Sequence, residues 1–239
     1  MKYIYGPVKS RRIGLSLGLT LTPSKACSFN CVYCQLGPTR ETTLERKEYI
    51  PIQEILEELK SWLANNNQKI AELNFITLSG SGEPTLNSGL GALIREIKKI
   101  TNVPVAVITN SSLLKEPDVR SQLQQADLVV PSLDAVTQSV FEKVDRPHPG
   151  IKIEEIIDAL ITFRKEFRGK IWLEVMLASG INDDLRQIKK LKEAIDKINP
   201  DKIQVNSPVR TTAEPGIVPV EQKKLKKIKE ILGDKCEIV

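Results

Sequence analysis

Apolar positions with two different spacings alternate along the chain. From Ile13 to Leu21, leucine or isoleucine occupies every second position, which is the spacing of a strand. The positions between them hold only Gly, Ser and Thr, so one face of this strand carries unusually small side chains. An apolar stripe with helical spacing then runs from Ile52 to Leu63, and Pro51 is placed to start that helix. The pattern therefore predicts a strand followed, after a polar segment, by a helix.

The same alternation continues to the end of the sequence. It predicts further strands at 73–79, 103–108, 128–130, 170–177 and 203–205, and further helices at 90–97, 118–125, 153–167, 185–198 and 223–232. Six strand–helix units indicate a parallel sheet, because right-handed crossover connections cover both of its faces. A closed eight-unit barrel needs two more units. We therefore predict an α/β fold in which residues 1–239 form a single domain, an open partial (β/α)6 barrel of parallel strands; a flat doubly wound sheet is the alternative.

Polar and glycine-rich segments follow most of the predicted strands. They are Ser79-Gly80-Ser81-Gly82-Glu83-Pro84-Thr85, Thr109-Asn110-Ser111-Ser112, Ser132-Leu133-Asp134 and Asn206-Ser207-Pro208-Val209-Arg210. Each segment alone is compatible with an ordinary turn or helix cap. In a parallel α/β barrel, however, the carboxyl ends of the strands meet at the face that carries the active site. We therefore expect these segments to converge on one site.

One carboxylate interrupts a predicted strand. Glu174 lies in the middle of the strand at 170–177, between Leu173 and Val175. Burying a carboxylate without a partner is costly. We expect Glu174 to point into a polar lumen that holds a ligand, and a structural salt bridge is the alternative.

Three of the four cysteines, Cys27, Cys31 and Cys34, lie within eight residues. We find no apolar leader, and no run approaches the roughly 20 apolar residues of a membrane helix, so we expect a cytoplasmic protein without membrane contact. Clustered cysteines in such a chain indicate metal or redox chemistry. Thiolates are the usual ligands of iron–sulfur clusters. Three ligands on a cluster of four irons leave one iron open to bind a substrate or cofactor.

Two other interpretations of these cysteines remain open. A structural zinc site needs four ligands, and His148 or Cys236 would have to complete the set. A redox pair formed by Cys31 and Cys34 is the second alternative, and it leaves Cys27 unexplained. For Cys236 itself we favour a small buried side chain in a terminal strand.

Charge adds candidates for contacts with a partner. The net charge of +5, from 35 Lys plus Arg against 30 Asp plus Glu, is compatible with an anionic or nucleic-acid partner. The lysine-rich helix at 223–232 has either a solvated cationic face or an RNA-binding one. The pair Arg11 and Arg12 could bind phosphate or carboxylate, or form surface ion pairs. The candidates that we expect to face the substrate are Arg11, Arg12, Arg146, His148 and Arg210.

The order of these motifs resembles that of the radical S-adenosylmethionine (SAM) superfamily. The C-x3-C-x2-C spacing follows the first predicted strand, and Tyr33 stands just before the last cysteine. The segment Ser81-Gly82-Glu83-Pro84 is similar to the family's glycine-glycine-glutamate segment, with Ser81 in place of the first glycine. The resemblance implies a [4Fe-4S] cluster on Cys27, Cys31 and Cys34 that binds SAM. It also implies a one-electron donor of the flavodoxin or ferredoxin type, whose electron cleaves SAM to a 5′-deoxyadenosyl radical that abstracts hydrogen from the substrate.

The resemblance also assigns roles to single residues. By analogy with the family, Gly82 and Glu83 would meet the methionine amino group, and Tyr33 would lie near the adenine. The other implied SAM contacts are Thr109 and Asn110 after the third strand, Ser132 and Asp134 after the fourth, and Glu174 in the fifth.

Three segments narrow the resemblance within the superfamily. Residues 82–86, 132–135 and 180–184 look like those of the group that contains the tRNA wyosine-base synthases, and residues 6–14 resemble short members of that group. Wyosine synthases carry a second cluster on upstream cysteines, and no cysteine precedes Cys27. We therefore expect one cluster and a related modification of tRNA, another RNA or a small metabolite. The alternatives are an activase that installs a glycyl radical on a protein partner, and a zinc-stabilised RNA-binding module without catalysis.

Overall fold

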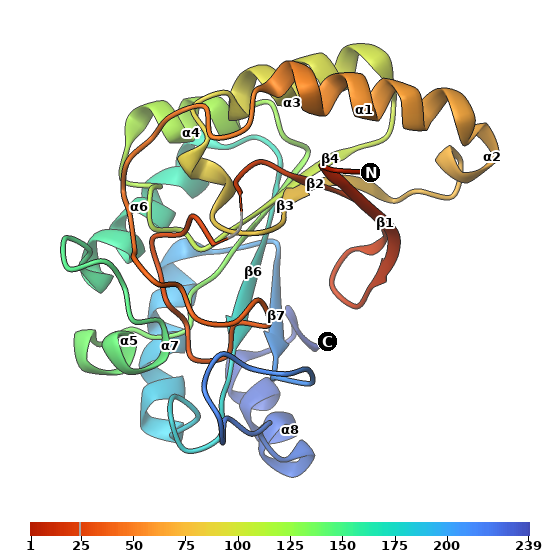
Figure 1. The fold of residues 1–239 in the computed structure, drawn as a ribbon. Helices are drawn as coiled ribbons and strands as arrows, with labels where there is room; N and C mark the ends of the chain where they lie inside the picture. Colours follow the sequence, from red (N-terminus) through yellow and green to blue (C-terminus); the bar gives the residue numbers. More distant parts are fainter. Residues whose placement is uncertain (24) are drawn as a thin grey trace.

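The computed structural model describes residues 1–23 and 25–239. Its sheet has eight strands in the order of the chain, β1 (Ile4–Ser10), β2 (Gly14–Thr20), β3 (Phe75–Ser79), β4 (Val105–Thr109), β5 (Leu128–Pro131), β6 (Lys170–Met176), β7 (Lys202–Asn206) and β8 (Cys236–Ile238). The six neighbouring pairs from β2 to β8 are parallel, and β1 is antiparallel to β2. The sheet curves without closing (Figure 1). The prediction of an open parallel barrel is confirmed.

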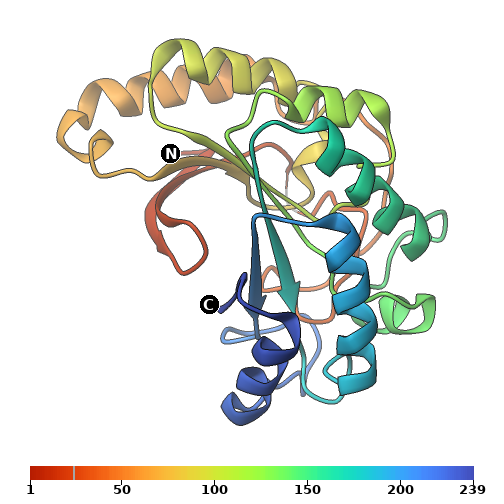
Figure 2. The same ribbon diagram turned by 180° about the vertical axis from the view of Figure 1, so that it is seen from behind.

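Helices cover the outer side of the curved sheet (Figure 2). They are α1 (Ile52–Asn65), α2 (Asn67–Ile70), α3 (Leu90–Ile100), α4 (Pro117–Leu123), α5 (Gln138–Val144), α6 (Ile153–Glu166), α7 (Leu185–Ile198) and α8 (Gln222–Leu232), with the 3-10 turn η1 at Pro84–Leu86. Apolar side chains of helices and strands form one large core between the two layers, because the longer helices each bury one apolar stripe. No helix in the described part of the chain is long and apolar enough to cross a membrane.

Strand β1 is the main element that the hydrophobic pattern did not predict. Gly6 and Pro7 interrupt any apolar alternation in its sequence, and proline in a sheet is confined to positions such as an edge strand. The Tyr5 ring of β1 lies across Gly18 of β2, where an added Cβ would stand 2.0 Å from a ring atom. This contact accounts for the glycine at position 18 of the small face, since a larger side chain there would displace the tyrosine.

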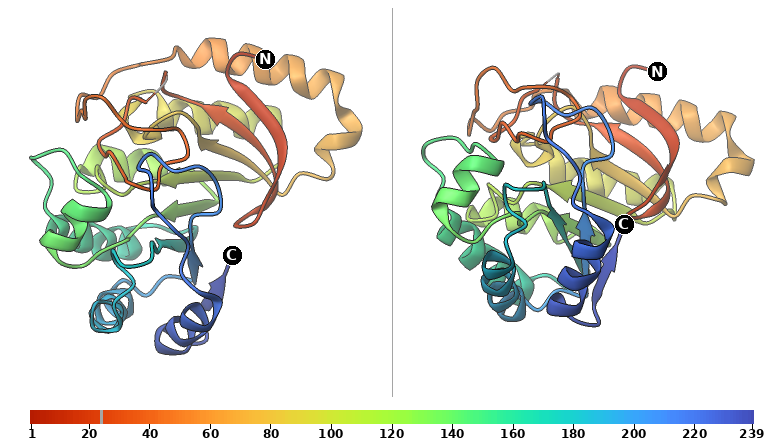
Figure 3. Two further views of the ribbon diagram at one scale, coloured as in Figure 1. Left: turned by 60° about the horizontal axis from the view of Figure 1, so that its bottom comes forward. Right: turned by 90° about the horizontal axis from the view of Figure 1, so that it is seen from below.

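The hairpin formed by β1 and β2 turns toward the carboxyl-terminal strands (Figure 3). At its tip, Ile13 is buried in a small apolar cluster with Ala106, Leu128 and Val130. The main-chain oxygen of Arg12 accepts a hydrogen bond of 2.8 Å from the Gln204 amide of β7. Side chains therefore connect the hairpin to the far end of an open sheet.

Two predictions about the carboxyl-terminal region are confirmed. Cys236 is 3% exposed and begins β8. Helix α8 buries Leu225, Ile228 and Leu232 and leaves most of its lysines exposed. The predicted amphipathic helix is thus present, and its exposed lysines are compatible with either a solvated or an RNA-binding face.

Candidate functional site

A cavity of about 420 Å³ lies at the carboxyl ends of the parallel strands. Its wall includes the last residues of β3, β4, β6 and β7, which are Ser79, Thr109, Met176 and Asn206. It also includes Ser132, the residue that follows β5. The cysteine loop and the β1–β2 hairpin complete the wall. The volume falls within the roughly 300–1,000 Å³ of ligand pockets. Residues from all four of the polar segments that follow predicted strands line this cavity, as their positions in the sequence predicted.

Most of the predicted site residues line this one cavity. They are Arg11, Arg12, Cys27, Cys31, Tyr33, Cys34, Gly82, Glu83, Thr109, Asn110, Ser132, Glu174 and Arg210. Asn206, which begins the polar segment after the strand predicted at 203–205, lines it as well, and so do Lys9, Lys25 and Met176, to which no sequence pattern pointed.

Three predicted site residues lie outside the cavity lining. The Asp134 carboxylate accepts hydrogen bonds from the Tyr33 hydroxyl and, at 2.8 Å, from the main-chain N–H of Met176. Arg146 forms an ion pair with Glu214. The main-chain N–H of His148 donates to the Ser28 oxygen at 2.9 Å. In this structure, Asp134 positions Tyr33 from behind, and the loop with His148 supports the back of the cysteine segment.

Contacts with neighbouring segments hold the cysteine loop in place. The Thr43 N–H donates to the Cys27 oxygen at 3.0 Å, and the Cys34 N–H donates to the Cys31 oxygen at 3.1 Å, which closes a turn. Phe29 packs edge-on against Phe141 of α5, with ring centroids 5.3 Å apart. These contacts place three sulfur atoms on the wall of one cavity, although the loop has no regular secondary structure.

The loop also depends on Gly82. The Glu83 N–H donates to the Ala26 oxygen at 3.0 Å, and a Cβ on Gly82 would stand 1.9 Å from that same oxygen. Only glycine permits so close an approach of the two backbones. This is a structural reason for the glycine that precedes Glu83.

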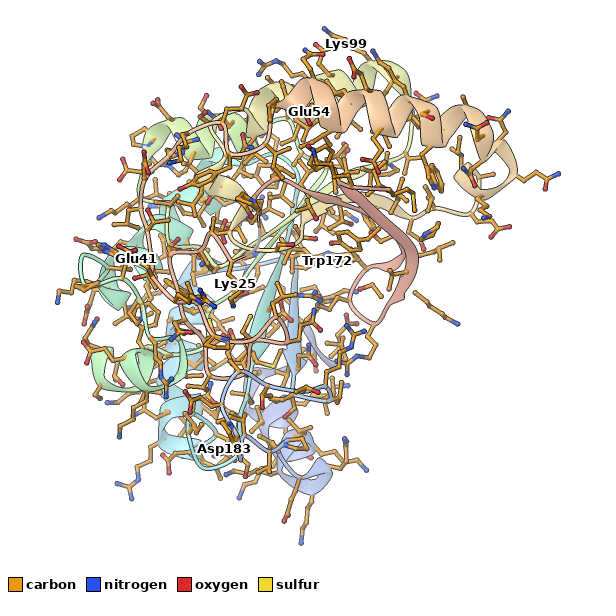
Figure 4. The ribbon with its side chains drawn as sticks, viewed as in Figure 1. Lys25, Glu41, Glu54, Lys99, Trp172 and Asp183 are labelled. Atoms are coloured by element: carbon orange, nitrogen blue, oxygen red, sulfur yellow. The ribbon has the colours of Figure 1, made fainter. Side chains whose placement is uncertain are left out.

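Burial opposes ionisation of two of the loop thiols, those of Cys27 and Cys31. Burial, with a smaller effect from the negative charge of Glu83, raises the pKa of Cys27 to about 12. Burial also raises the pKa of Cys31 well above its ordinary value. Lys25, near the middle of the molecule in Figure 4, has its Nζ 3.0 Å from the Cys34 sulfur. A bound metal deprotonates the thiols that coordinate it, so thiols of this kind fit a cationic cluster better than free thiolate chemistry.

The donor set fits a cubane better than a single zinc ion. No three His, Cys, Asp or Glu side chains in residues 1–23 and 25–239 converge as the ligands of one metal ion would. In a [4Fe-4S] cluster each thiolate binds a different iron, so three cysteines can surround the cluster without converging on a point. The zinc alternative requires either His148 or Cys236 as its fourth ligand, and neither is part of the cavity lining.

Glu83 connects the ends of two strands. Its side chain is buried and accepts hydrogen bonds from the Thr85 N–H (3.0 Å), the Thr85 hydroxyl (2.7 Å), the Thr109 hydroxyl (2.7 Å) and the Asn110 N–H (2.7 Å). Burial raises the pKa of Glu83, while these donors favour its charged form and oppose that rise. The carboxylate thus positions Thr109 and Asn110, and the Asn110 amide in turn donates to the Ser28 hydroxyl at 2.9 Å.

Glu174 both faces a polar cavity and forms a salt bridge, the two environments that its position in a strand suggested. It is 4% exposed, lines the cavity, and forms an ion pair with Arg12 of the hairpin. The Asn206 amide donates to its second oxygen at 3.2 Å. The carboxylate therefore points into a polar lumen and is neutralised there by a salt bridge.

Comparison with known proteins agrees with this geometry. A family model described as the radical SAM superfamily matches residues 21–208, and the chain belongs to that superfamily. The chain is 34% identical over 235 residues to the UPF0026 protein MJ1312 of Methanocaldococcus jannaschii, covering 98% of this chain and 72% of that protein. Within the superfamily, it is therefore a member of the UPF0026 family.

Two further matches differ in what they cover. A protein of Brachyspira hyodysenteriae named GTPase Obg is 41% identical over 237 residues, which are 99% of this chain but 34% of that protein. The crystal structure of Streptococcus suis SuiB bound to S-adenosylmethionine superposes with a TM-score of 0.65 at 16% identity, over 93% of this chain and 49% of SuiB. That structural likeness concerns the fold.

Proposed function

We propose that Cys27, Cys31 and Cys34 hold one [4Fe-4S] cluster and that the protein uses it with SAM to modify a base in tRNA or another RNA. The observation that carries the proposal is the single cavity in which the three cysteines meet the polar ends of the neighbouring strands. Membership of the radical SAM superfamily supports the same cofactor pair.

The cofactors would supply the reactive chemistry, and the chain would supply binding and orientation. With an external one-electron donor, the bound cluster would supply reductive cleavage of SAM to methionine and a 5′-deoxyadenosyl radical, and this radical would take a hydrogen atom from the substrate. Gly82, Thr109 and Asn110, which line the cavity, would hold the methionine end, and the hydrogen bonds of Glu83 to Thr109 and Asn110 support this role. Tyr33, held by Asp134, forms part of the wall near which the adenine would lie. Enclosure by the hairpin would keep water away from the radical.

RNA is the favoured substrate for two reasons. Residues 82–86, 132–135 and 180–184 resemble the group that contains tRNA wyosine-base synthases. In addition, Lys9, Arg11 and Arg210 line the cavity and are exposed, which suits a phosphate backbone. A small anionic metabolite is the competing substrate class.

The cofactor proposal is tested by anaerobic reconstitution with iron and sulfide. We expect iron and sulfide in the amounts of one [4Fe-4S] cluster per chain, with the visible absorption of such a cluster. The reduced protein should convert SAM to 5′-deoxyadenosine. Cys31→Ala should lose both properties, whereas Cys236→Ala, which changes a buried cysteine outside the cavity, should keep them. One zinc per chain and no iron would show that the proposal is wrong.

The substrate proposal needs a separate experiment. Cells are grown with deuterated nutrients, and their RNA and small-molecule fractions are supplied separately to the reduced, cluster-loaded protein. Deuterium should appear in 5′-deoxyadenosine with the RNA fraction, because the hydrogen atom is taken from the substrate. Transfer from the small-molecule fraction alone would contradict an RNA substrate and leave the cofactor proposal intact.

A further inference from the structure

Positive charge exceeds negative charge on the side chains that line the cavity. The carboxylates of the lining are Glu83 and Glu174, and the cations are Lys9, Arg11, Arg12, Lys25 and Arg210. Both carboxylates are already engaged, Glu83 by Thr85, Thr109 and Asn110, and Glu174 by Arg12 and Asn206. A cavity of this composition favours an anionic ligand, because field lines concentrate in a cleft lined by one sign of charge.

Arg12 differs from the other cations because a buried group orients it. The Glu174 side chain is 6% exposed, while the Arg12 side chain remains 29% exposed toward the cavity. A guanidinium has five N–H donors. Among the residues that the structure describes, the Arg12 guanidinium donates one hydrogen bond, from Nη1 to the Glu174 carboxylate. The remaining donors are available to a ligand, in the fork geometry that suits phosphate and carboxylate.

The main chain at Arg12 is fixed as well. The Gln204 amide of β7 donates to the Arg12 main-chain oxygen at 2.8 Å, and the Arg12 N–H donates to the Ser10 hydroxyl at 3.2 Å. Asn206 donates to Glu174 and also accepts a 3.0 Å hydrogen bond from the neighbouring Arg11. Contacts from β6 and β7 thus hold Arg12 before any ligand binds, and such preorganisation reduces the entropic cost of binding.

The rim of the cavity combines further cations with apolar surface. Arg210 donates to the uncharged Gln35 side chain at 2.8 Å, so its charge is not neutralised by that contact. Of the six large apolar side chains that are exposed in the described chain, four line this cavity, namely Tyr5, Val8, Leu36 and Val209. Cations next to apolar surface suit a ligand that joins a phosphate to a flat or apolar body, as a nucleotide does.

We propose that Arg12, oriented by Glu174, is the residue that binds a phosphate group of the substrate, with Lys9 and Arg210 adding positive charge at the rim. Phosphate suits this site better than a single carboxylate, because it presents more acceptor oxygens to the guanidinium donors and carries one negative charge as a diester in RNA or up to two as a monoester in a free nucleotide. The phosphate could belong to an RNA chain or to a free nucleotide. The assignment to the substrate rests on the proposed function, whereas the anion site itself can be measured without turnover.

The test is calorimetric titration of the cluster-loaded protein, saturated with SAM, with pyrophosphate as the probe. The variant is Arg12→Gln combined with Glu174→Gln, because removing the arginine alone would leave a buried, unpaired carboxylate. Loss of a charge-assisted contact should weaken pyrophosphate binding by about tenfold or more. Arg168→Gln removes the same charge from an exposed position outside the cavity lining and should leave the affinity unchanged.

Several outcomes would overturn the proposal. They are the absence of pyrophosphate binding to the unaltered protein, equal affinity of the double variant, and binding of malonate as tight as that of pyrophosphate. An equal loss of SAM affinity in the double variant would assign the pair to the cofactor and also overturn it. Displacement of pyrophosphate by a nucleoside monophosphate or by tRNA supports the proposal and distinguishes the two sources, and displacement by neither contradicts it.

The two proposals fail in different ways. An unaltered protein that binds pyrophosphate but never cleaves SAM contradicts the proposed function. A protein that cleaves SAM, but whose pyrophosphate affinity is unchanged when Arg12 and Glu174 are replaced, contradicts only the phosphate site.

Discussion

Replacing Gly82 by alanine tests how the chain positions its cysteines. The added Cβ would lie 1.9 Å from the Ala26 oxygen, 2.7 Å from the Ala26 carbonyl carbon and 2.8 Å from the Thr22 hydroxyl. Ordinary contact begins at 3.4 Å, so the two backbones must separate by about 1.5 Å. Two of the three obstructing atoms belong to the main chain and cannot move aside by a change of rotamer. The segment that leads into Cys27 must therefore shift.

The shift should affect the cofactor more than the fold. Overpacking of this kind costs about 1–3 kcal/mol, which most domains tolerate, because their stability is of the order of 5–15 kcal/mol. A displacement of about 1 Å at a reacting group, by contrast, can lower a rate about a hundredfold. We therefore expect Gly82→Ala to fold, to lose 1 to 3 kcal/mol of unfolding free energy, and to cleave SAM at least about tenfold more slowly.

Three measurements check this expectation on reconstituted protein: the iron and sulfide content, the rate of 5′-deoxyadenosine formation, and the midpoint of urea unfolding. Gly150→Ala is the matched control, because its Cβ would meet its nearest neighbour at an ordinary 3.4 Å. A Gly82→Ala protein with a full cluster and an unchanged rate would refute the role assigned to the glycine.

Two further predictions concern residues that support the site. Asn87 is fully buried, donates to the Leu21 and Ile50 main-chain oxygens at 2.8 and 3.0 Å, and accepts from the Gly89 N–H. Asn87→Ala should lower the free energy of unfolding by about 2–4 kcal/mol, because it leaves several buried groups without hydrogen-bond partners. A loss below about 0.5 kcal/mol in urea unfolding would contradict this reasoning. Asp184 caps α7 by accepting a hydrogen bond from the Arg186 N–H at 2.9 Å. Asp184→Ala should lower the free energy of unfolding, measured in the same way, by about 1 kcal/mol. Asp184→Asn keeps a capping oxygen and should lower it less.

The hydrophobic pattern was sufficient for most of the framework. Leucines at every second position between Ile13 and Leu21 predicted β2, and the apolar stripe from Ile52 to Leu63 predicted α1. These elements follow from local spacing, because each must bury one face. Strand β1 was missed because Gly6-Pro7 breaks the alternation. Helix α5 was missed because its seven residues show less than two full repeats and it lacks the proline that begins α4, a helix of the same length that was predicted.

The cysteine motif and the polar strand ends also predicted where the site would form. Parallel strands bring their carboxyl ends to one face whatever the details of packing, so Ser132 and Thr109 could be placed in the site from their positions alone. Local sequence could not decide which side of a loop a residue occupies. Asp134 follows Ser132 by two positions, yet it lies behind Tyr33, outside the cavity lining.

The sequence by itself determined the class of fold, the clustered thiols and the face on which they lie, because spacing along the chain carries that information. Only the tertiary structure decided that Arg146 pairs with Glu214 away from the cavity, while Arg12 reaches Glu174, 162 positions along the chain. Partnerships of this kind depend on how far the open sheet curves and where the β1–β2 hairpin crosses it. Those quantities arise from the packing of all eight strands, and no local pattern contains them.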